Sequence, residues 1–249
     1  MKHLLMNFPY KAVLFDWAYS LVDLVCEDDR AAFLKVKEFL EDKRVALPQF
    51  ESLFSDYQEL FYGLIKESRL THREVNFETV LRYLFFKYGI EIDNIATYKE
   101  ILTVYYKVIH GVRKIYPDVV STLDQLHQAG VRMGIVSNTT NPSFIKEEEL
   151  RLTGLDKYFE FAVYSSSVPY RKPHPSIFDG VVSRLQVNLN EVLFVGDNLI
   201  MDVQGPQSIG MPAAWLNRNK SSLLDGIFPD YQITNLRELL QIKPLNLIN

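Results

Sequence analysis

The chain has a single cysteine, Cys26, among its 249 residues. One thiol cannot form an intramolecular disulfide, and it cannot supply a zinc site built from several cysteines. We interpret Cys26 as a small buried or half-buried hydrophobic residue, because free cysteines mostly behave in this way. The sequence therefore excludes a fold held by internal disulfides and a metal centre of several thiolates.

A surplus of positive charge is also missing. The 27 lysine and arginine residues are outnumbered by 31 aspartate and glutamate residues, and the formal net charge is −4. Nucleic-acid-binding domains usually carry a basic patch, so we expect no nucleic-acid partner. A small phosphorylated ligand stays compatible with this charge, because its site needs only one or two local cations.

Long apolar runs are absent as well. The segment from Met1 to Tyr10 is too short and too interrupted for a signal peptide. No uninterrupted apolar run approaches the length of a membrane span. We therefore expect a soluble, cytoplasmic protein without a membrane partner. Hydrophobic residues still make up 47% of the chain, which is enough for a packed core.

The most informative stretch begins with a short apolar run, residues 12–15, which Asp16 follows. Such a run is typical of a strand that is buried on both faces of a parallel sheet. Open α/β sheets place their chemistry at the carboxyl ends of the strands, which makes Asp16 a candidate functional residue. A strand can also end in an aspartate that is solvated or caps a helix, so other motifs must decide.

The segment from about Leu24 to His110 has helical periodicity, over a length far greater than an ordinary connection. We interpret its aromatic side chains as the core of a helical bundle. These side chains are Phe54, Phe61, Phe77, Phe85, Phe86, Tyr105 and Tyr106. The four predicted helices span about 28–40, 48–64, 75–88 and 95–110.

Helices and strands alternate from Tyr116 onward. Alternating units of this length predict parallel strands with right-handed helical crossovers. The fold class is therefore α/β, with a Rossmann-like core over residues 1–22 and 112–249. An all-helical cap, residues 23–111, is inserted after the first strand. Within the helix predicted at 142–152, we interpret Glu147, Glu148 and Glu149 as a solvated face.

Polar residues follow the predicted strands at one edge of this sheet. They are Asp16, Ser137, Asn138, Lys172, Asp197 and Asp202. Clustered carboxylates repel one another unless a cation joins them, and Mg²⁺ is a divalent ion that prefers oxygen ligands. An aspartate can attack phosphorus and form an aspartyl phosphate, while Mg²⁺ and a lysine neutralise the phosphoryl charge.

These segments, in this order, resemble the motifs of the haloacid dehalogenase superfamily of hydrolases, in the subfamily with a helical cap between motifs one and two. The most specific pieces are residues 16–23, the run Lys172-Pro173-x-Pro175-x-Ile177-Phe178, and Gly196-Asp197-x4-Asp202. The resemblance implies a hydrolase that acts on a small phosphorylated metabolite. It implies that Asp16 is the nucleophile and that Ser137 hydrogen-bonds the transferring group. It also implies that Lys172 holds the nucleophile and the charge of the phosphoryl group in place.

The resemblance also implies a Mg²⁺ site. Asp16, the backbone carbonyl of Ala18 and Asp197 would bind the ion, and Asp202 would support its water shell or Lys172. We expect Asn138 and Tyr19 to contact the substrate.

Ala18 departs from the family pattern. Phosphatases of the family carry a second aspartate two residues after the nucleophile, which protonates the leaving group and later activates water. A positioned acid or base is worth about 10²–10⁴ in rate, so we expect weak or unusual acid/base chemistry. Tyr19 and Ser20 stand where Gly and Thr are usual, and the glycine normally eases a tight turn. We expect Tyr19 to narrow the mouth of the pocket.

Three functions remain open at this stage. The first is hydrolysis of a phosphorylated or otherwise activated small molecule. The second is a phosphonatase-like carbon–phosphorus hydrolase, because Asp16-Trp17-Ala18 resembles motif one of phosphonoacetaldehyde hydrolase, where a cap lysine forms a Schiff base. The candidate cap lysines are Lys35, Lys37, Lys43, Lys66, Lys87, Lys99 and Lys107. The third is a weak or inactive member that binds a ligand or partner. The substrate and the oligomeric state stay open.

Overall fold

The core of the molecule is a six-stranded sheet in the order β5-β4-β1-β6-β7-β8, with every neighbouring pair parallel. The computed structural model describes residues 8–24, 27–92, 95–110 and 113–245, so Cys26 lies outside the described residues. The strands are β1 (Ala12–Phe15), β4 (Arg132–Ser137), β5 (Phe161–Tyr164), β6 (Val192–Gly196), β7 (Ala213–Leu216) and β8 (Tyr231–Ile233). The predicted α/β fold class is confirmed.

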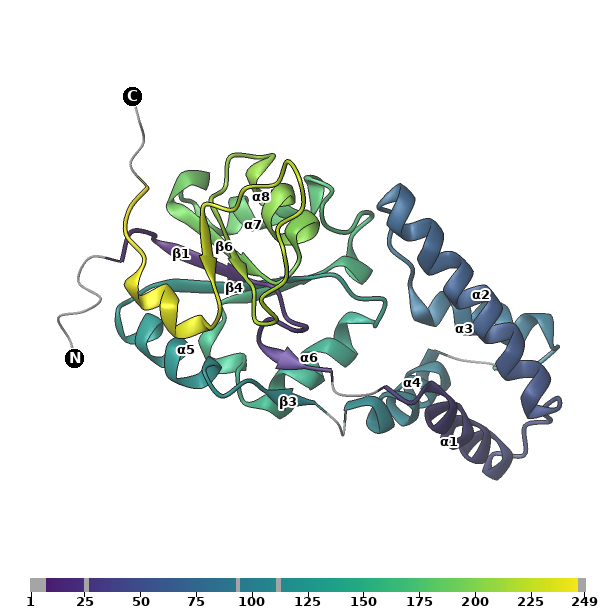
Figure 1. The fold of residues 1–249 in the computed structure, drawn as a ribbon. Helices are drawn as coiled ribbons and strands as arrows, with labels where there is room; N and C mark the ends of the chain where they lie inside the picture. Colours follow the sequence, from purple (N-terminus) through teal and green to yellow (C-terminus); the bar gives the residue numbers. More distant parts are fainter. Residues whose placement is uncertain (1–7, 25–26, 93–94, 111–112, 246–249) are drawn as a thin grey trace.

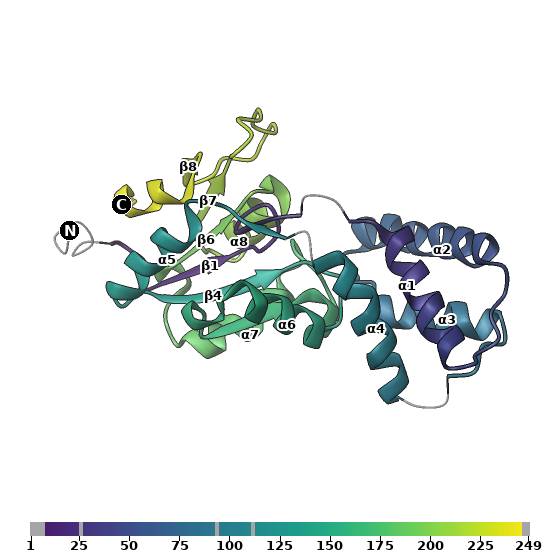
Figure 2. The same ribbon diagram turned by 90° about the horizontal axis from the view of Figure 1, so that it is seen from below.

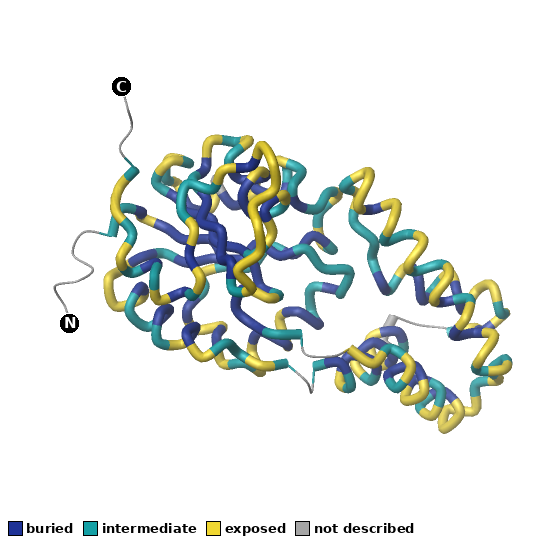
Figure 3. Tube along the Cα trace, viewed as in Figure 1, coloured by how far each residue is buried: buried dark blue, intermediate teal, exposed yellow. Residues whose placement is uncertain are grey.

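The central strand β1 is buried on both faces, as its apolar sequence predicts, and Figure 3 shows the sheet as a buried centre. Val13 and Phe15 pack with the side chains of α5 (Val119–Gln128) and η5 (Leu236–Gln241). Ala12 and Leu14 pack with α7 (Ser176–Leu185) on the opposite face. Successive side chains of a strand point to opposite faces, so one apolar run serves both layers.

The remaining core elements are short, apart from α6 (Ser143–Thr153). The strands β2 (Val22–Asp23) and β3 (Lys114–Ile115) pair in antiparallel fashion. They lie in the chain segments that enter and leave the helical segment. The others are η1 (Asp156–Tyr158), η2 (Ser165–Ser167), η3 (Leu189–Glu191), η4 (Leu199–Gln204) and α8 (Gly205–Gln207).

Four helices between β2 and β3 share a second hydrophobic core. They are α1 (Asp29–Asp42), α2 (Phe50–Thr71), α3 (Phe77–Lys87) and α4 (Ile95–His110). The aromatic residues predicted to form a bundle core do so, with the exception of Phe86, which is 81% exposed. Adjacent helical residues point about 100° apart, so Phe86 cannot share the core-facing side of α3 with its buried neighbour Phe85.

These helices lie as a separate group beside the sheet (Figures 1 and 2). Their contacts with the core come from segments that follow the strands. The backbone N–H of Phe77 donates to Thr140 O at 2.9 Å, and that of Arg171 donates to His72 O at 2.8 Å. The group therefore meets the carboxyl edge of the sheet. The predicted boundaries stay predictions, and residues 111–112 lie outside the described residues.

Among the described residues, no helix is both long and apolar enough to span a bilayer.

Candidate active site

Three carboxylates meet where β1 and β6 end. Asp16 follows β1 and Asp197 follows β6, and these strands pair in parallel with Phe15 opposite Val195. Residues that follow two adjacent parallel strands are neighbours in space, and η4 adds Asp202. One oxygen atom from each carboxylate lies within 4.8 Å of the other two. The sheet register thus brings together the three aspartates that the motifs singled out.

Gly196 makes room for the buried member of this trio. A Cβ atom at Gly196 would collide with the Asp202 carboxyl group. That carboxyl group accepts a hydrogen bond from Asn198 N through Oδ2, at 3.0 Å. The Asn198 side chain in turn caps the first turn of η4 by accepting from Ile200 N and Met201 N. The sequence from Gly196 to Asp202 therefore folds into a turn that returns Asp202 to the strand end.

Lys172 places its ammonium group between two of these carboxylates. Its Nζ donates to Asp16 Oδ1 at 2.8 Å and to Asp202 Oδ1 at 2.7 Å. Burial lowers the pKa of Lys172, but the charges of Asp16 and Asp202 outweigh burial and raise it above its ordinary value. Lys172 therefore stays protonated and screens the two carboxylates from each other.

Asn138 holds the Lys172 loop in place. Its Oδ1 accepts from Lys172 N at 2.8 Å, and its Nδ2 donates to Lys172 O at 2.9 Å. The side-chain amide of Asn138, which we expected to contact the substrate, thus forms hydrogen bonds with the backbone of Lys172. A substrate contact from Asn138 stays a prediction.

The site has less positive charge than its three carboxylates require, and Asp197 is the clearest case. No side chain in the described part of the chain donates a hydrogen bond to its carboxylate. Burial raises the pKa of Asp197 to about 7, with further contributions from Asp16 and Asp202. Burial also raises the pKa of Asp202, against the lowering effect of Lys172. One lysine does not balance three carboxylates, so the oxygen donor set fits a hard divalent cation such as Mg²⁺.

The loop after Asp16 turns sharply at Tyr19, whose φ of 60° lies in the left-handed region that favours glycine. Its backbone N–H donates to Val22 O at 2.7 Å. The tight turn that the family pattern implies is therefore present, and here it is made with tyrosine. The side chain of Tyr19 is 50% exposed.

Two adjoining cavities open at this edge of the sheet. The first, which we call the aspartate cavity, has a volume of about 180 Å³ and is lined by Asp16, Ala18, Tyr19, Lys172, Asp197 and Asp202, among others. The second, which we call the arginine cavity, has a volume of about 220 Å³. Ala18, Asn138 and Arg171 line both. Their combined size suits a small molecule.

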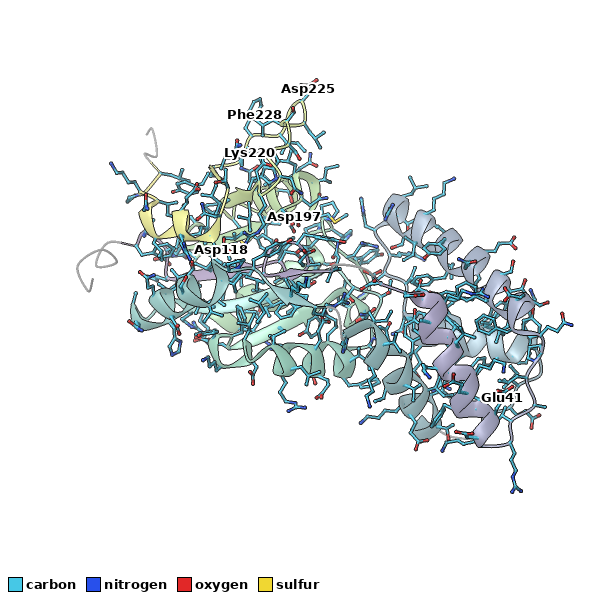
Figure 4. All side chains as sticks on the ribbon, turned by 60° about the horizontal axis from the view of Figure 1, so that its bottom comes forward. Glu41, Asp118, Asp197, Lys220, Asp225 and Phe228 are labelled. Atoms are coloured by element: carbon cyan, nitrogen blue, oxygen red, sulfur yellow. The ribbon has the colours of Figure 1, made fainter. Side chains whose placement is uncertain are left out.

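Ser137 lines the arginine cavity, where the end of β4 buries it to 2% exposure. The structure thus groups seven of the eight predicted site residues around the aspartate cavity and places the eighth, Ser137, in the wall of the adjoining arginine cavity. Figure 4 labels Asp197, which lies beside the loop that carries Lys220.

A buried ion cluster behind the Ala18 loop was missed by the sequence interpretation. Glu149, which is 1% exposed, accepts from Trp17 Nε1 at 3.0 Å and from Arg113 Nε at 2.9 Å. Lys146 Nζ donates to its other oxygen. Burial opposes ionisation of Glu149, but the charges of Lys146 and Arg113 prevail and lower its pKa to about 2. Burial in turn lowers the pKa of Lys146.

The expectation of a solvated face over Glu147 to Glu149 is therefore wrong for Glu149, although its two neighbours are exposed. A signal was present in the spacing. The buried residues of α6 are Ile145, Lys146, Glu149 and Leu150, which recur at helical period on one face. A charged pair among apolar residues on one face indicates a buried ion pair.

Comparison with known families agrees with the motifs. A model of the haloacid dehalogenase-like hydrolases matches residues 49–216. This chain belongs to the haloacid dehalogenase-like hydrolases. The matched range contains Ser137, Lys172, Asp197 and Asp202, and it begins after Asp16.

Individual members of this hydrolase family resemble the chain along nearly all of its length. A glyceraldehyde 3-phosphate phosphatase from Pyrococcus furiosus is 30% identical over 93% of this chain and 92% of that protein. The crystal structure of a HAD phosphatase from Thermococcus onnurineus has a TM-score of 0.62 and 28% identity, covering 94% of this chain and 100% of that one.

A 2-haloacid dehalogenase from Pseudomonas syringae also has this fold, with a TM-score of 0.69, 24% identity and coverage of 93% of this chain and 97% of that one. This likeness shows the fold alone. The choice between chemistries within the family must come from the site.

Proposed function

We propose that this hydrolase is a phosphatase of small phosphorylated molecules, with Asp16 as its nucleophile. The observation that carries the proposal is the position of Asp16, 2.8 Å from the ammonium group of Lys172 and beside Asp197. A carboxylate nucleophile, a buried cation and oxygen ligands for a metal are what phosphoryl transfer needs, because its catalysis is mostly positioning and charge stabilisation. The relatives described as phosphatases support the same choice.

Mg²⁺ is the cofactor that we propose. Asp16, the backbone carbonyl of Ala18 and Asp197 would hold it. Both oxygens of Asp202 already accept hydrogen bonds, from Lys172 and from Asn198, so we assign Asp202 to supporting Lys172 and the edge of the metal site. When bound, the ion would stabilise the charge of the phosphoryl group.

The reaction proceeds in two steps on Asp16. Its carboxylate attacks phosphorus and the ester oxygen leaves, which forms an aspartyl phosphate; water then releases phosphate and restores the carboxylate. Ser137 donates to a phosphoryl oxygen, and Lys172 orients Asp16 and offsets the growing charge. Ala18 offers no proton to the leaving oxygen. Acyl phosphates and other substrates with good leaving groups are therefore the ones this site handles best.

We also propose that residues 23–111 act as a cap over Asp16. Glu74, at the helical side, accepts from Ser165 Oγ at 2.5 Å and lies 3.5 Å from Arg171 Nη1. Burial raises the pKa of Glu74, so this contact is shielded from water. A cap that closes here would exclude water from the phosphoryl group.

The phosphonatase-like alternative needs a cap lysine at the site. None of the seven candidate lysines lines the aspartate cavity or the arginine cavity. Four of them form surface ion pairs: Lys35 with Glu38, Lys37 with Glu41, Lys43 with Glu100 and Lys87 with Asp56. No observation favours this function, so it is not proposed.

Acetyl phosphate hydrolysis with Mg²⁺ tests the proposal, together with the change in melting temperature on adding Mg²⁺ and vanadate. The wild type should turn over acetyl phosphate and gain thermal stability, because a ligand that binds the native state stabilises it. Asp16→Asn should abolish turnover, and Asp197→Asn should abolish the Mg²⁺-dependent shift. Asp225→Asn, a change at an exposed carboxylate, is the matched control. A wild type without turnover would instead be an inactive member that only binds a ligand.

A further inference from the structure

The walls of the arginine cavity carry more basic than acidic side chains. Its charged lining consists of Arg69, Arg113, Lys146 and Arg171, against Glu27 and Glu74. These side chains come from both the helical group and the core. The cavity shares Ala18, Asn138 and Arg171 with the aspartate cavity, so whatever it holds lies next to the proposed phosphoryl site.

The carboxylates around this cavity are shared among more cations than they can neutralise. Glu149 forms ion pairs with both Arg113 and Lys146. Glu27 pairs with the Nη2 atom of the same arginine, at 2.6 Å. Arg69, an exposed residue of α2, has no ion pair among the residues that the structure describes. A net positive charge is thus left facing the cavity.

Two buried guanidinium donors of residues in its wall also have no acceptor among the residues that the structure describes. They are Nη1 of Arg113, whose side chain is 6% exposed, and Nε of Arg171. A buried donor without a partner costs free energy, and native structures rarely leave one unmet. An anionic ligand in the cavity would lie close to these two guanidinium groups, whose positive charges favour it.

We propose that the arginine cavity binds a second anionic group of the substrate, a carboxylate or another phosphoryl group, close to the phosphoryl group at Asp16. This inference rests on the proposed phosphatase function and names its substrate class. Arg69, Arg113, Lys146 and Arg171 recognise the second anion, and an alkyl phosphate without a second anionic group leaves their charges unmatched. The enzyme therefore prefers doubly anionic substrates.

Matched substrates test this preference. The probes are 2-phosphoglycolate, propane-1,3-diol bisphosphate and ethyl phosphate, which carry a second carboxylate, a second phosphoryl group and no second anion. We expect kcat/KM for at least one doubly anionic probe to exceed that for ethyl phosphate by about tenfold or more, since hydrogen bonds between charged groups are the strong ones. The probe that gains shows which anion the cavity takes. Equal values for all three probes would overturn the inference.

Variants locate the effect. Arg69→Gln changes an exposed residue and should leave the fold intact, while Lys146→Met leaves Glu149 paired with Arg113. Both should lower the preference about three- to thirtyfold, mainly through KM. Arg151→Gln, which removes an equal charge from the exposed outer face of α6, should leave the preference unchanged. A preference that survives in both cavity variants would refute the assignment.

A binding measurement separates this inference from the proposed function. Phosphonoacetate and 1,3-propylenediphosphonate should raise the melting temperature more than ethylphosphonate does, and the excess should shrink in Arg69→Gln. If that holds while no phosphate ester is hydrolysed, the phosphatase proposal fails and the second-anion site stands. If ethyl phosphate is hydrolysed as well as the doubly anionic probes and the three phosphonates stabilise equally, the phosphatase proposal stands and the second-anion site fails.

Discussion

Replacing Ala18 by aspartate restores the acid/base group that phosphatases of this family use. Under the proposed mechanism, the alkoxide of a monoester leaves the wild type without a proton from residue 18, and the aspartyl phosphate is hydrolysed without a base there. Both steps lose the contribution of a positioned acid or base, which is worth about 10²–10⁴ in rate. Ala18→Asp should therefore raise monoester turnover.

The structure sets the size of the gain. Ala18 lines both cavities, so a carboxyl group placed there reaches the leaving oxygen. The loop is constrained by Tyr19 at φ 60°, and a misplacement of about 1 Å can cost 10²-fold. We expect a gain of about one to three orders of magnitude, equivalent to about 1.4–4 kcal/mol of barrier.

The assay is a series of aryl and alkyl phosphates with leaving groups of increasing pKa. The wild type should show a steep fall of kcat/KM along the series, and Ala18→Asp should flatten it, because a proton donor matters most for the poorest leaving groups. Ala18→Asn is the matched control, because asparagine has nearly the same shape as aspartate but cannot act as an acid or a base. Adding Asp16→Asn should abolish activity in every background.

The outcome that would refute this reasoning is equally definite. If Ala18→Asp and Ala18→Asn behave alike, residue 18 does not limit the reaction. If the wild type hydrolyses alkyl phosphates as fast as aryl phosphates, another group already supplies the proton.

Further predictions concern stability, measured by urea unfolding. Tyr19→Gly should stabilise the fold by about 1 kcal/mol, because glycine adopts the left-handed region without strain and the exposed side chain contributes little packing; a loss would show that the tyrosine ring packs usefully. Lys172→Met should cost about 3–5 kcal/mol, because it leaves buried carboxylates without their cation, and a cost below about 1 kcal/mol would contradict the ion-pair geometry. Burial lowers the pKa of His110 from 6.5 to about 4, so between these values the unfolded state binds more protons than the folded state. The unfolding free energy should therefore fall as pH decreases from 6.5 to 4, by about 2–3 kcal/mol relative to His110→Gln; parallel pH curves for the two proteins would disprove it.

The sequence alone determined the fold class and most of the candidate site. The apolar run of β1, the alternation after Tyr116 and the helical period of the inserted segment are local patterns, because burial on one or two faces imposes a period on neighbouring residues. Asp16, Lys172 and Asp197 could be found for a similar reason. Each lies in a short motif at a strand end or loop, and parallel strands bring such positions to one edge.

Tertiary structure alone decided which charges are buried and what they contact. Lys172 lies 156 positions from Asp16 in the chain, and its Nζ still donates to that carboxylate at 2.8 Å. Glu149 sits in a run of three glutamates, and only the packing of Trp17 and Arg113 against α6 makes it a buried anion. The four cations of the arginine cavity come from separate segments, so no local pattern contains them. The free energy of a charge depends on every segment packed around it, and that arrangement exists only in the folded chain.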